Sequence, residues 1–313
     1  MVSEALLEEL QTMVEVRRDE PLARHTTFGI GGPADIYVAV STADELRQLT
    51  AMCHRHETPF FVLGAGSNIL VGDMGIRGVV IENRARRVEA PQERQNGSAL
   101  FRVESGASLA SLARDLTRKG FAGLEWAGGI PGTIGGAVVY NAGAYDGCLA
   151  NVLVGVGMAD KEGQEYALDI NELGLGYRES SFTRRLFTGQ VILWAELRLV
   201  PGSIEELQKK TEEFDHLRQE SQPRGRSAGS IFKNAREYPA WWLIDQVGLR
   251  GHRIGDAEFS VKHPNFILNV GQARAADVKA LMELAQEKVR AEFSIKLSPE
   301  VAFVGEGFGN DNE

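Results

Sequence analysis

The chain has 313 residues, 43% hydrophobic and 25% charged, so it is long enough for two or three domains that each bury a core. Its 34 basic and 43 acidic residues give a formal net charge of −9, which argues against nucleic acid as the main ligand. No apolar run approaches the roughly 20 residues that span a bilayer, and the N-terminus lacks a signal-peptide pattern, so neither membrane insertion nor export is expected.

The first eighty residues combine helix and strand patterns, which predicts a small α/β lobe. Apolar residues at helical spacing predict a helix over 3–16, and Thr42 with Glu45 forms a capping box that opens a second helix. Strands are predicted at 36–40, 60–63, 69–71 and 78–82.

A glycine loop, Gly64-Ala-Gly-Ser-Asn68, follows the strand at 60–63 and offers N–H donors and a hydroxyl to a pyrophosphate. It resembles the Rossmann fingerprint only superficially, because a β-rich segment follows it where that fingerprint opens a helix. A hairpin turn is the plain alternative for this loop taken alone.

A second glycine-rich run spans 123–146, after a predicted strand at 99–104 and a helix at 108–119. Bulky residues are too few there for an ordinary helix or strand, so the run is predicted to bring backbone close to a dinucleotide or similar cofactor. A string of turns would explain any single glycine, but not the five that lie within 128–136. No Gly-Lys-Ser/Thr follows, so the run is not a P-loop.

The remaining chain is predicted to begin with strands, to continue with helices and a further strand, and to close with a strand. Pro201-Gly202 is the best candidate for a domain boundary, and an acidic tail after Gly305 is expected to be disordered. The predicted strands are 152–158, 166–168, 191–200, 266–270 and 297–304, and the predicted helices are 203–222, 240–247 and 275–293.

Seven motifs, in order from about Arg24 to Gly305, resemble those of the UDP-N-acetylenolpyruvoylglucosamine reductases, the flavoenzyme family called MurB. They are T-x-F-G-I-G-G-P-A-D, G-A-G-S-N-I-L-V, G-G-I-P-G-T-I-G-G-A-V-V-Y-N-A-G-A-Y, Y-R-E-S-S-F, A-G-S-I-F-K-N, H-P-N-F-I-L-N and L-S-P-E-V. The chain resembles the shorter subgroup, which lacks a tyrosine-bearing insertion.

The resemblance implies an α+β fold: a two-lobed FAD-binding module of the vanillyl-alcohol-oxidase (PCMH) type plus a C-terminal α/β substrate-binding domain. The expected divisions are lobe 1 with its leading helix at 1–83, lobe 2 at 84–202, the substrate-binding domain at 203–306 and a disordered tail at 307–313.

The resemblance also implies non-covalent FAD, NADPH as reductant, and reduction of UDP-N-acetylglucosamine enolpyruvate to UDP-N-acetylmuramate in peptidoglycan precursor synthesis. This chemistry needs a hydride from flavin N5 at the enolpyruvyl β carbon, a proton at the α carbon and stabilisation of the carboxylate. A cytoplasmic monomer is expected. The two cysteines and six histidines show no metal-ligand spacing, so no metal site is predicted.

The resemblance assigns Ser230 as proton donor, and Arg178 and Glu300 as the residues that activate the substrate carboxylate. The alternatives are a turn-capping serine and a structural ion pair. Substrate contacts are predicted at Tyr177, Lys233 and Asn234. Cofactor contacts are predicted at Gly64, Ala65, Gly66, Ser67, Asn68, Gly129, Ile130, Gly132, Thr133, Gly135, Gly136, Asn141 and Gly143.

Several residues outside these sets receive structural roles. Trp241 and Trp242 are predicted in the core, His263 is predicted to be structural, and Asn265 is predicted to organise its loop through bonds to backbone. Ala235, where the family commonly has proline, and the compact basic segment 223–227 depart from the family pattern.

Two other functions remain open at this point. One is a different flavin-dependent oxidase on the same scaffold; such enzymes often tether FAD through a histidine or cysteine, for which His25 and Cys148 are the candidates here. The other is a non-catalytic nucleotide-sugar binding protein, against which Ser230, Arg178 and Glu300 argue.

Overall fold

The computed structural model describes residues 2–309, which form two compact units, each built from separate stretches of the chain. The first comprises Met1–Val16, Tyr37–Gly64 and Val79–Arg218, and the second comprises Arg17–Ile36, Ala65–Gly78 and Gln219–Glu313. The residues of the expected first lobe, 1–83, therefore contribute to both units. The division into three domains stays a prediction.

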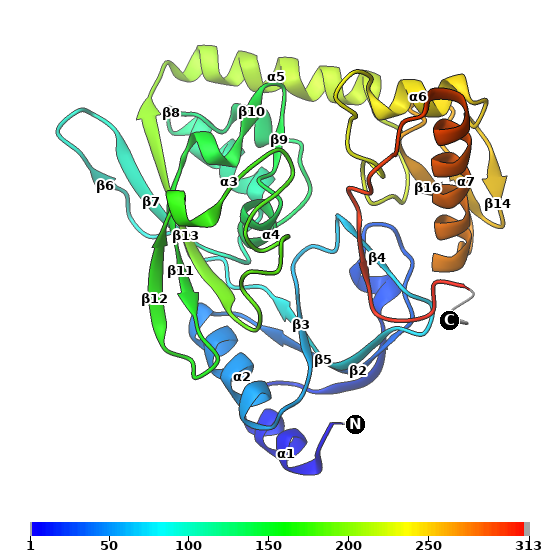
Figure 1. The fold of residues 1–313 in the computed structure, drawn as a ribbon. Coiled ribbons are helices and arrows are strands. Elements are labelled where there is room, and N and C mark those ends of the chain that lie inside the picture. Colours follow the sequence, from blue (N-terminus) through cyan, green and yellow to red (C-terminus); the bar gives the residue numbers. More distant parts are fainter. Residues whose placement is uncertain (1, 310–313) are drawn as a thin grey trace. The chain divides into compact units, whose positions relative to one another are not determined.

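A four-stranded sheet of order β1-β2-β5-β3 contains the two strands that pass from one unit to the other (Figure 1). These are β2 (Pro33–Val40) and β5 (Ile76–Asn83), and both are mostly buried. The outer strands are β1 (Arg17–Pro21) and β3 (Phe60–Leu63), and β3 pairs with β5 in parallel.

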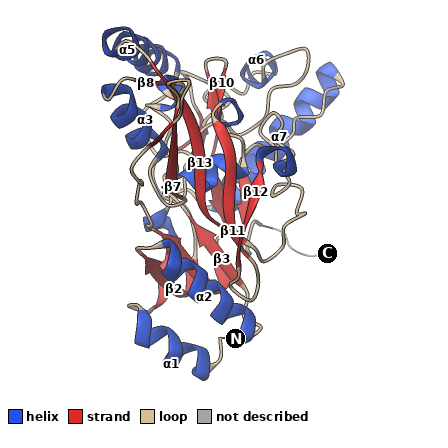
Figure 2. Cartoon of the chain, turned by 90° about the vertical axis from the view of Figure 1, so that its left-hand side faces the viewer, coloured by secondary structure: helices blue, strands red, loops and turns tan. Residues whose placement is uncertain are grey.

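The first unit contains a larger antiparallel sheet of order β12-β11-β13-β7-β6 (Figure 2). Its strands are β6 (Gln92–Glu93), β7 (Ala99–Glu104), β11 (Leu153–Ala159), β12 (Glu165–Asp169) and β13 (Val191–Pro201), and β8 (Phe121–Ala122) pairs with β13. The sequence predicted β7 with its observed ends, because apolar and polar residues alternate over its second half.

Side chains cap the helices of the first unit where the sequence predicted helix starts. Thr42 accepts from the N–H of Glu45 at 3.1 Å and begins α2, and Ser108 accepts from the N–H of Ser111 and begins α3. The longer helices are α1 (Glu4–Met13), α2 (Ala43–Arg55), α3 (Leu109–Arg118) and α5 (Ile204–Ser221), of which α5 continues into the second unit.

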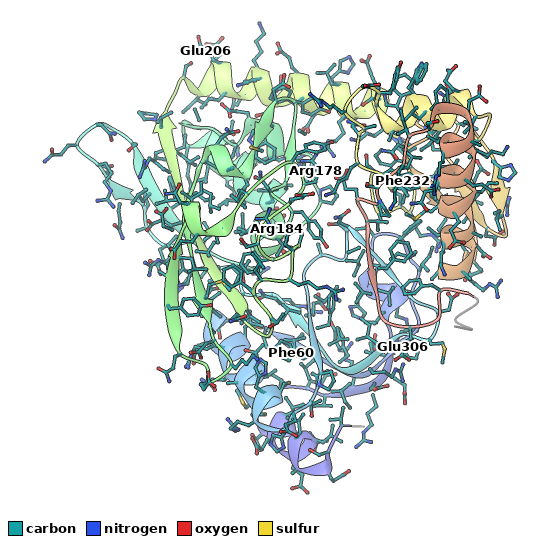
Figure 3. The ribbon with its side chains drawn as sticks, in the orientation of Figure 1. Phe60, Arg178, Arg184, Glu206, Phe232 and Glu306 are labelled. Atoms are coloured by element: carbon teal, nitrogen blue, oxygen red, sulfur yellow. The ribbon has the colours of Figure 1, made fainter. Side chains whose placement is uncertain are left out.

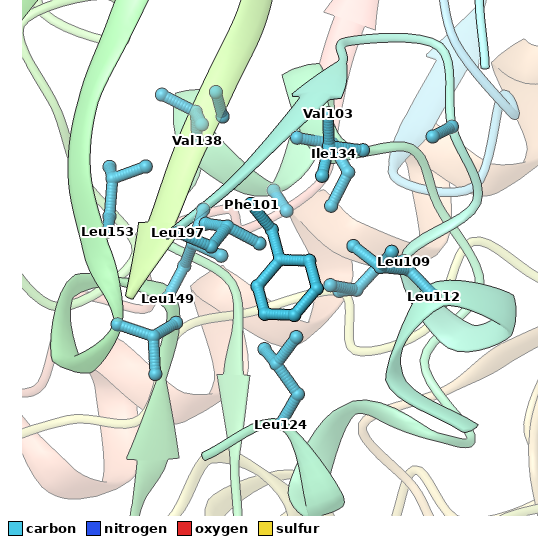
Figure 4. Close-up of a cluster of buried hydrophobic side chains, with 14 of the residues drawn as sticks. Phe101, Val103, Leu109, Leu112, Leu124, Ile134, Val138, Leu149, Leu153 and Leu197 are labelled. Atoms are coloured by element: carbon cyan, nitrogen blue, oxygen red, sulfur yellow. The ribbon is translucent and has the colours of Figure 1, made fainter. Parts of the chain in front are cut away.

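The core of the first unit surrounds Phe101, whose ring lies among leucines from several elements (Figure 4). Buried Asn83, at the end of β5, donates to Ser105 Oγ at 2.8 Å, and Ser105 Oγ donates to the carbonyl of Ile192 at 2.6 Å. These bonds join β5 to the larger sheet without leaving a buried polar group unpaired.

The glycine-rich run contains a short helix that the sequence did not predict, α4 (Ile134–Val139). Thr133 caps it, and Ile134, Ala137 and Val138 are buried in the core of the first unit. The expectation of no helix was wrong because three small or branched apolar residues at helical spacing suffice for one and a half turns against a sheet. A two-stranded hairpin, β9 (Gly143–Ala144) and β10 (Gly147–Cys148), follows.

The second unit packs two helices, α6 (Ala240–Gln246) and α7 (Ala275–Phe293), with short strands around buried Phe232 and Phe259. A three-stranded sheet contains β14 (Arg253–Ile254), β15 (Ala257–Phe259) and β16 (Ile267–Asn269), and β4 (Ile69–Val71) pairs in parallel with β17 (Ala302–Val304). The helix predicted at 275–293 agrees with α7 at both ends.

Two expectations for the second unit were wrong. Trp241 is 39% exposed, so only Trp242 packs against the core as predicted. The tail is ordered at Gly307, whose carbonyl accepts from the N–H of Asp73 at 2.9 Å, and at Phe308, which packs against the core. The rest of the predicted tail, 310–313, lies outside the described residues.

Candidate active site

The two glycine-rich segments predicted to bind cofactor meet at Gly64 and Thr133 in the first unit. A Cβ on residue 64 would lie 2.6 Å from Thr133 Oγ1, which is closer than a carbon can approach. Glycine at 64 therefore permits the contact between the end of β3 and the start of α4.

The N–H groups of the second run divide into two classes. Those of Ile134 and Gly135 donate to the carbonyls of Ala107 and Ser105, and that of Gly136 donates to Thr133 Oγ1. Within residues 2–309, no protein acceptor is present for the N–H groups of Gly129, Gly132 and Thr133.

Thr133 is only 9% exposed, and a buried N–H without a protein partner is uncommon, so its environment fits a ligand that brings acceptor oxygens. A Cβ on exposed Gly136 would meet nothing closer than 3.6 Å, so the surface beside it is open. The main chain at 129–133 therefore fits the phosphates of a dinucleotide cofactor.

Helix α5 covers one end of this run. A Cβ on Gly129 would lie 2.8 Å from Arg218 Cδ and 3.1 Å from Asp215 Oδ1, so glycine also permits the close approach of the helix. Burial lowers the pKa of the Arg218 guanidinium. Phe214 of the same helix stacks on Tyr145 with ring centroids 4.7 Å apart.

Arg178 lies in a tight turn of the first unit, where it contacts the predicted cofactor segment (Figure 3). Its Nη2 donates to the carbonyl oxygen of Gly143 at 2.6 Å, and its guanidinium lies 5.4 Å from the ring of Tyr177. Arg178 has φ 55°, a left-handed backbone conformation that residues other than asparagine and glycine seldom adopt. Tyr177 is 57% exposed.

Ser230 and Glu300 lie on neighbouring extended segments of the second unit. The N–H of Glu300 donates to the carbonyl oxygen of Ile231 at 2.8 Å, so residue 300 is paired with the residue next to the serine. On the other side, Ser230 forms a β-bridge with Phe266, and Ile231 donates to the carbonyl of Asn265. Both site residues are half-buried.

Asn265 stabilises the segment after Ser230 through side-chain bonds to backbone, as the sequence predicted. Its Oδ1 accepts from the N–H of Phe232 at 3.0 Å, and its Nδ2 donates to the carbonyl of Phe232 at 2.9 Å. The nearby His263 Nδ1 is buried without a partner among the described atoms, and burial lowers the pKa of the ring.

The space beside Ser230 is open, because a Cβ on Gly229 would meet no atom within 4 Å. Lys233 is half-buried on the same extended segment, and its N–H donates to the carbonyl of Ser298. Asn234, which is predicted to contact the substrate, has a structural role here: its Oδ1 accepts from the N–H of Ala240 at the start of α6 at 3.0 Å.

Thr27 was not predicted as a site residue, although it lies within the T-x-F-G motif. Its N–H donates to the carbonyl of Gly66 at 3.1 Å, and its Oγ1 donates to the carbonyl of Ser227 at 2.7 Å. It therefore joins the first glycine loop to the segment that leads to Ser230. The available signal was a hydroxyl two residues before Gly29, but nothing in the sequence indicated its distant partner.

The structure thus brings together Ser230, Glu300, Lys233 and the loop 65–68 in the second unit, and Arg178, Tyr177, Asn141, Gly143 and the run 129–136 in the first. Over residues 2–309, no group of three potential metal ligands converges. None of the described helices is long and apolar enough to cross a membrane.

Two family models match the chain. Residues 34–169 match the FAD binding domain, and residues 220–304 match the UDP-N-acetylenolpyruvoylglucosamine reductase, C-terminal domain. A UDP-N-acetylenolpyruvoylglucosamine reductase of a Synechococcus species is 44% identical over 287 residues, which cover 91% of this chain and 90% of the relative. That of Moorella thermoacetica is 40% identical over 306 residues, covering 97% and 98%.

The fold is similar to the crystal structure of UDP-N-acetylenolpyruvylglucosamine reductase (MurB) from Thermus caldophilus. The two share 37% sequence identity with a TM-score of 0.75, and the match covers 93% of this chain and 98% of that one. Together with the match to the FAD binding domain, it confirms the predicted fold class.

Proposed function

This chain belongs to the family of UDP-N-acetylenolpyruvoylglucosamine reductases. From that premise we propose which of its residues bind the cofactor, donate the proton and stabilise the substrate carboxylate. The protein is an FAD-dependent oxidoreductase that reduces UDP-N-acetylglucosamine enolpyruvate with NADPH as reductant, a step of peptidoglycan precursor synthesis. Bound FAD would supply the hydride chemistry that links NADPH to the β carbon of the enolpyruvyl double bond.

We assign the cofactor phosphates to the main chain at Gly129, Gly132 and Thr133. The observation that supports this is the absence of protein acceptors for these three N–H groups among the described residues, although Thr133 is buried. Gly64 contributes by letting β3 approach Thr133, rather than through a side chain of its own.

Ser230 delivers the proton to the substrate α carbon. Hydride addition at the β carbon leaves an electron pair at the α carbon and its carboxylate, and this strongly basic centre can take a proton from a hydroxyl. Open space beside Gly229 supports substrate access, and we assign the replacement proton to Lys233, three residues further along the same segment.

Arg178 and Glu300 act at the carboxylate end. A guanidinium can bind a carboxylate through two parallel hydrogen bonds, and it stabilises the charge that collects there more in the transition state than in the bound substrate. The pairing of Glu300 with Ile231 fixes its backbone beside that of Ser230, which supports a shared task. Tyr177, Lys233 and Asn234 contact the remaining substrate.

We further propose that the enzyme works in the cytoplasm as a monomer, where its nucleotide-sugar substrate and NADPH are available. Sedimentation of the FAD-loaded protein tests the oligomeric state, because a dimer would sediment at twice the expected mass.

One spectroscopic experiment tests the function. Purified protein should be yellow, should be bleached by NADPH without oxygen, and should regain its colour on addition of the enolpyruvyl sugar. A binding protein without activity would not regain colour with the sugar. A flavin that stays attached after mild denaturation would instead indicate a covalently tethered oxidase, with His25 or Cys148 as the attachment point.

A further inference from the structure

We propose that Asn141 is a positioning residue that holds the Arg178 turn in the shape needed to bind the substrate carboxylate, an inference that rests on the proposed function of Arg178. The motif around Asn141 predicts a cofactor contact. In the structure, its side chain forms hydrogen bonds to two other segments of the first unit.

Asn141 is 7% exposed, and both ends of its amide are engaged. Nδ2 donates to the carbonyl oxygen of Gly176 at 2.9 Å, and Oδ1 accepts from the N–H of Ala150 at 3.0 Å. Asn141 itself has φ 41°, a conformation that asparagine tolerates better than most residues. The amide therefore connects the end of α4 to the turn that carries Arg178.

The backbone of that turn is strained at Arg178. Gly176 and Glu179 exchange backbone bonds, with N–H to O distances of 2.9 Å and 3.4 Å, which places Tyr177 and Arg178 at the two corners. A positive φ at the second corner normally requires glycine or asparagine, but Arg178 occupies it. Such a conformation persists only when the surroundings over-determine it.

Three hydrogen bonds supply that constraint, one from each part of the turn. Asn141 binds the carbonyl of Gly176 before the corner, Arg178 Nη2 binds the carbonyl of Gly143 at 2.6 Å, and buried Ser180 Oγ binds the carbonyl of Val139 at 2.5 Å after it. All three anchor points lie within 139–143, so the end of α4 and the residues that follow it fix the conformation of the arginine turn. Two-point binding of a carboxylate depends on such a preset orientation.

Asn141→Asp is the sharpest variant. It keeps the size and an oxygen that can accept from Ala150, but it replaces the donor to Gly176 with an oxygen that faces a carbonyl oxygen. In the FAD-loaded enzyme we expect reoxidation by the enolpyruvyl sugar to slow by on the order of 10²-fold, while reduction by NADPH changes less than about twofold. Hydrogen exchange at the N–H of Glu179 should accelerate, which reports the turn directly.

Asn83→Asp is the matched control. Asn83 is 6% exposed in the same unit, donates from Nδ2 to Ser105 Oγ, and accepts on Oδ1 from the N–H of Ala85. It lies outside the proposed machinery, so both half-reactions should keep their rates. If Asn141→Asp fails to fold, Ser180→Ala removes the bond to Val139 from the same turn and should give the same split between half-reactions.

A double-mutant cycle tests whether Asn141→Asp slows reoxidation through its effect on Arg178. In an Arg178→Lys background, Asn141→Asp should cost little more, because the group it positions is already lost. An undiminished effect in that background would overturn the inference while leaving the role of Arg178 intact. Wild-type reoxidation in Arg178→Lys alone would instead refute the proposed function of Arg178, and the inference with it.

Discussion

The side-chain amide of Asn68 donates a hydrogen bond to the main-chain carbonyl oxygen of Glu300 at 3.3 Å, and the N–H of Ala302 donates to the carbonyl of Asn68 at 3.0 Å. The N–H of Glu300 in turn binds Ile231, the neighbour of Ser230. The first glycine loop, the proposed carboxylate-activating glutamate and the proposed proton donor are therefore parts of one hydrogen-bonded assembly in the second unit.

Ser230→Ala should separate the two half-reactions. Flavin reduction by NADPH should stay near the wild-type rate, and product formation should be abolished because no hydroxyl remains to protonate the α carbon. Anaerobic stopped-flow absorbance of the flavin measures both steps. Ser298→Ala, exposed on the neighbouring segment, is the control. Equal loss of both half-reactions in Ser230→Ala would refute the proton-donor role.

Arg178→Lys should slow reoxidation by the substrate by about 10²–10³-fold, since lysine offers a point charge in place of two parallel donors. Arg184→Lys is a matched control, because Arg184 is an exposed residue of the same loop whose Nη2 binds the carbonyl of Gly174 at 2.7 Å (Figure 3). Single-turnover reoxidation of the reduced enzyme measures both variants. Equal slowing of the two would show a loop-wide effect rather than carboxylate binding.

Gly64→Ala should destabilise the flavin-free protein, because its Cβ would overlap Thr133 Oγ1 at 2.6 Å. Overpacking of this kind costs about 1–3 kcal/mol of unfolding free energy, which urea unfolding can measure. The comparison is Gly136→Ala within α4, where the added Cβ meets nothing closer than 3.6 Å and alanine favours the helix by up to about 1 kcal/mol. Similar unfolding midpoints for the two variants would contradict the close contact between the loops.

His263 should make stability depend on pH on the acid side of neutrality. Burial lowers the pKa of its ring in the folded state, so between that lowered value and about 6.5 the unfolded chain binds more protons. The unfolding free energy should therefore rise with pH through this window and level off above it. His263→Gln should flatten the rise, whereas His252→Gln at an exposed site should not. An unchanged slope in His263→Gln would exclude this histidine as the cause.

Periodic elements were predictable from the sequence because burial on one face leaves a regular pattern. The strands at 60–63 and 99–104 and the helix at 275–293 have the predicted ends. Helix α4 was missed because glycines dilute its pattern, and its stability comes from packing in the core rather than from helix propensity. Trp241 was misplaced because a short helix cannot bury adjacent residues equally.

The sequence motifs indicated candidate segments for the site, but they could not distinguish the roles of individual residues within those segments. Gly129 and Gly135 look alike in the sequence, yet Gly135 donates its N–H to Ser105 whereas that of Gly129 has no acceptor among the described residues. The distant partners of Asn141 and Thr27 were equally hidden, because hydrogen bonds between segments far apart in the chain leave no local spacing to detect.

The interleaved composition of the two units bears on how the protein is made. During synthesis, segments 17–36 and 65–78 leave the ribosome long before 219–309, the stretch that completes their unit, whereas the other unit has all its parts once Arg218 has emerged. The parts of these segments that bind residues 219–309, including the loop that holds Asn68, must therefore remain without those partners until synthesis ends. A nascent chain arrested just after α5 should expose these segments to protease, and release of the finished chain should protect them.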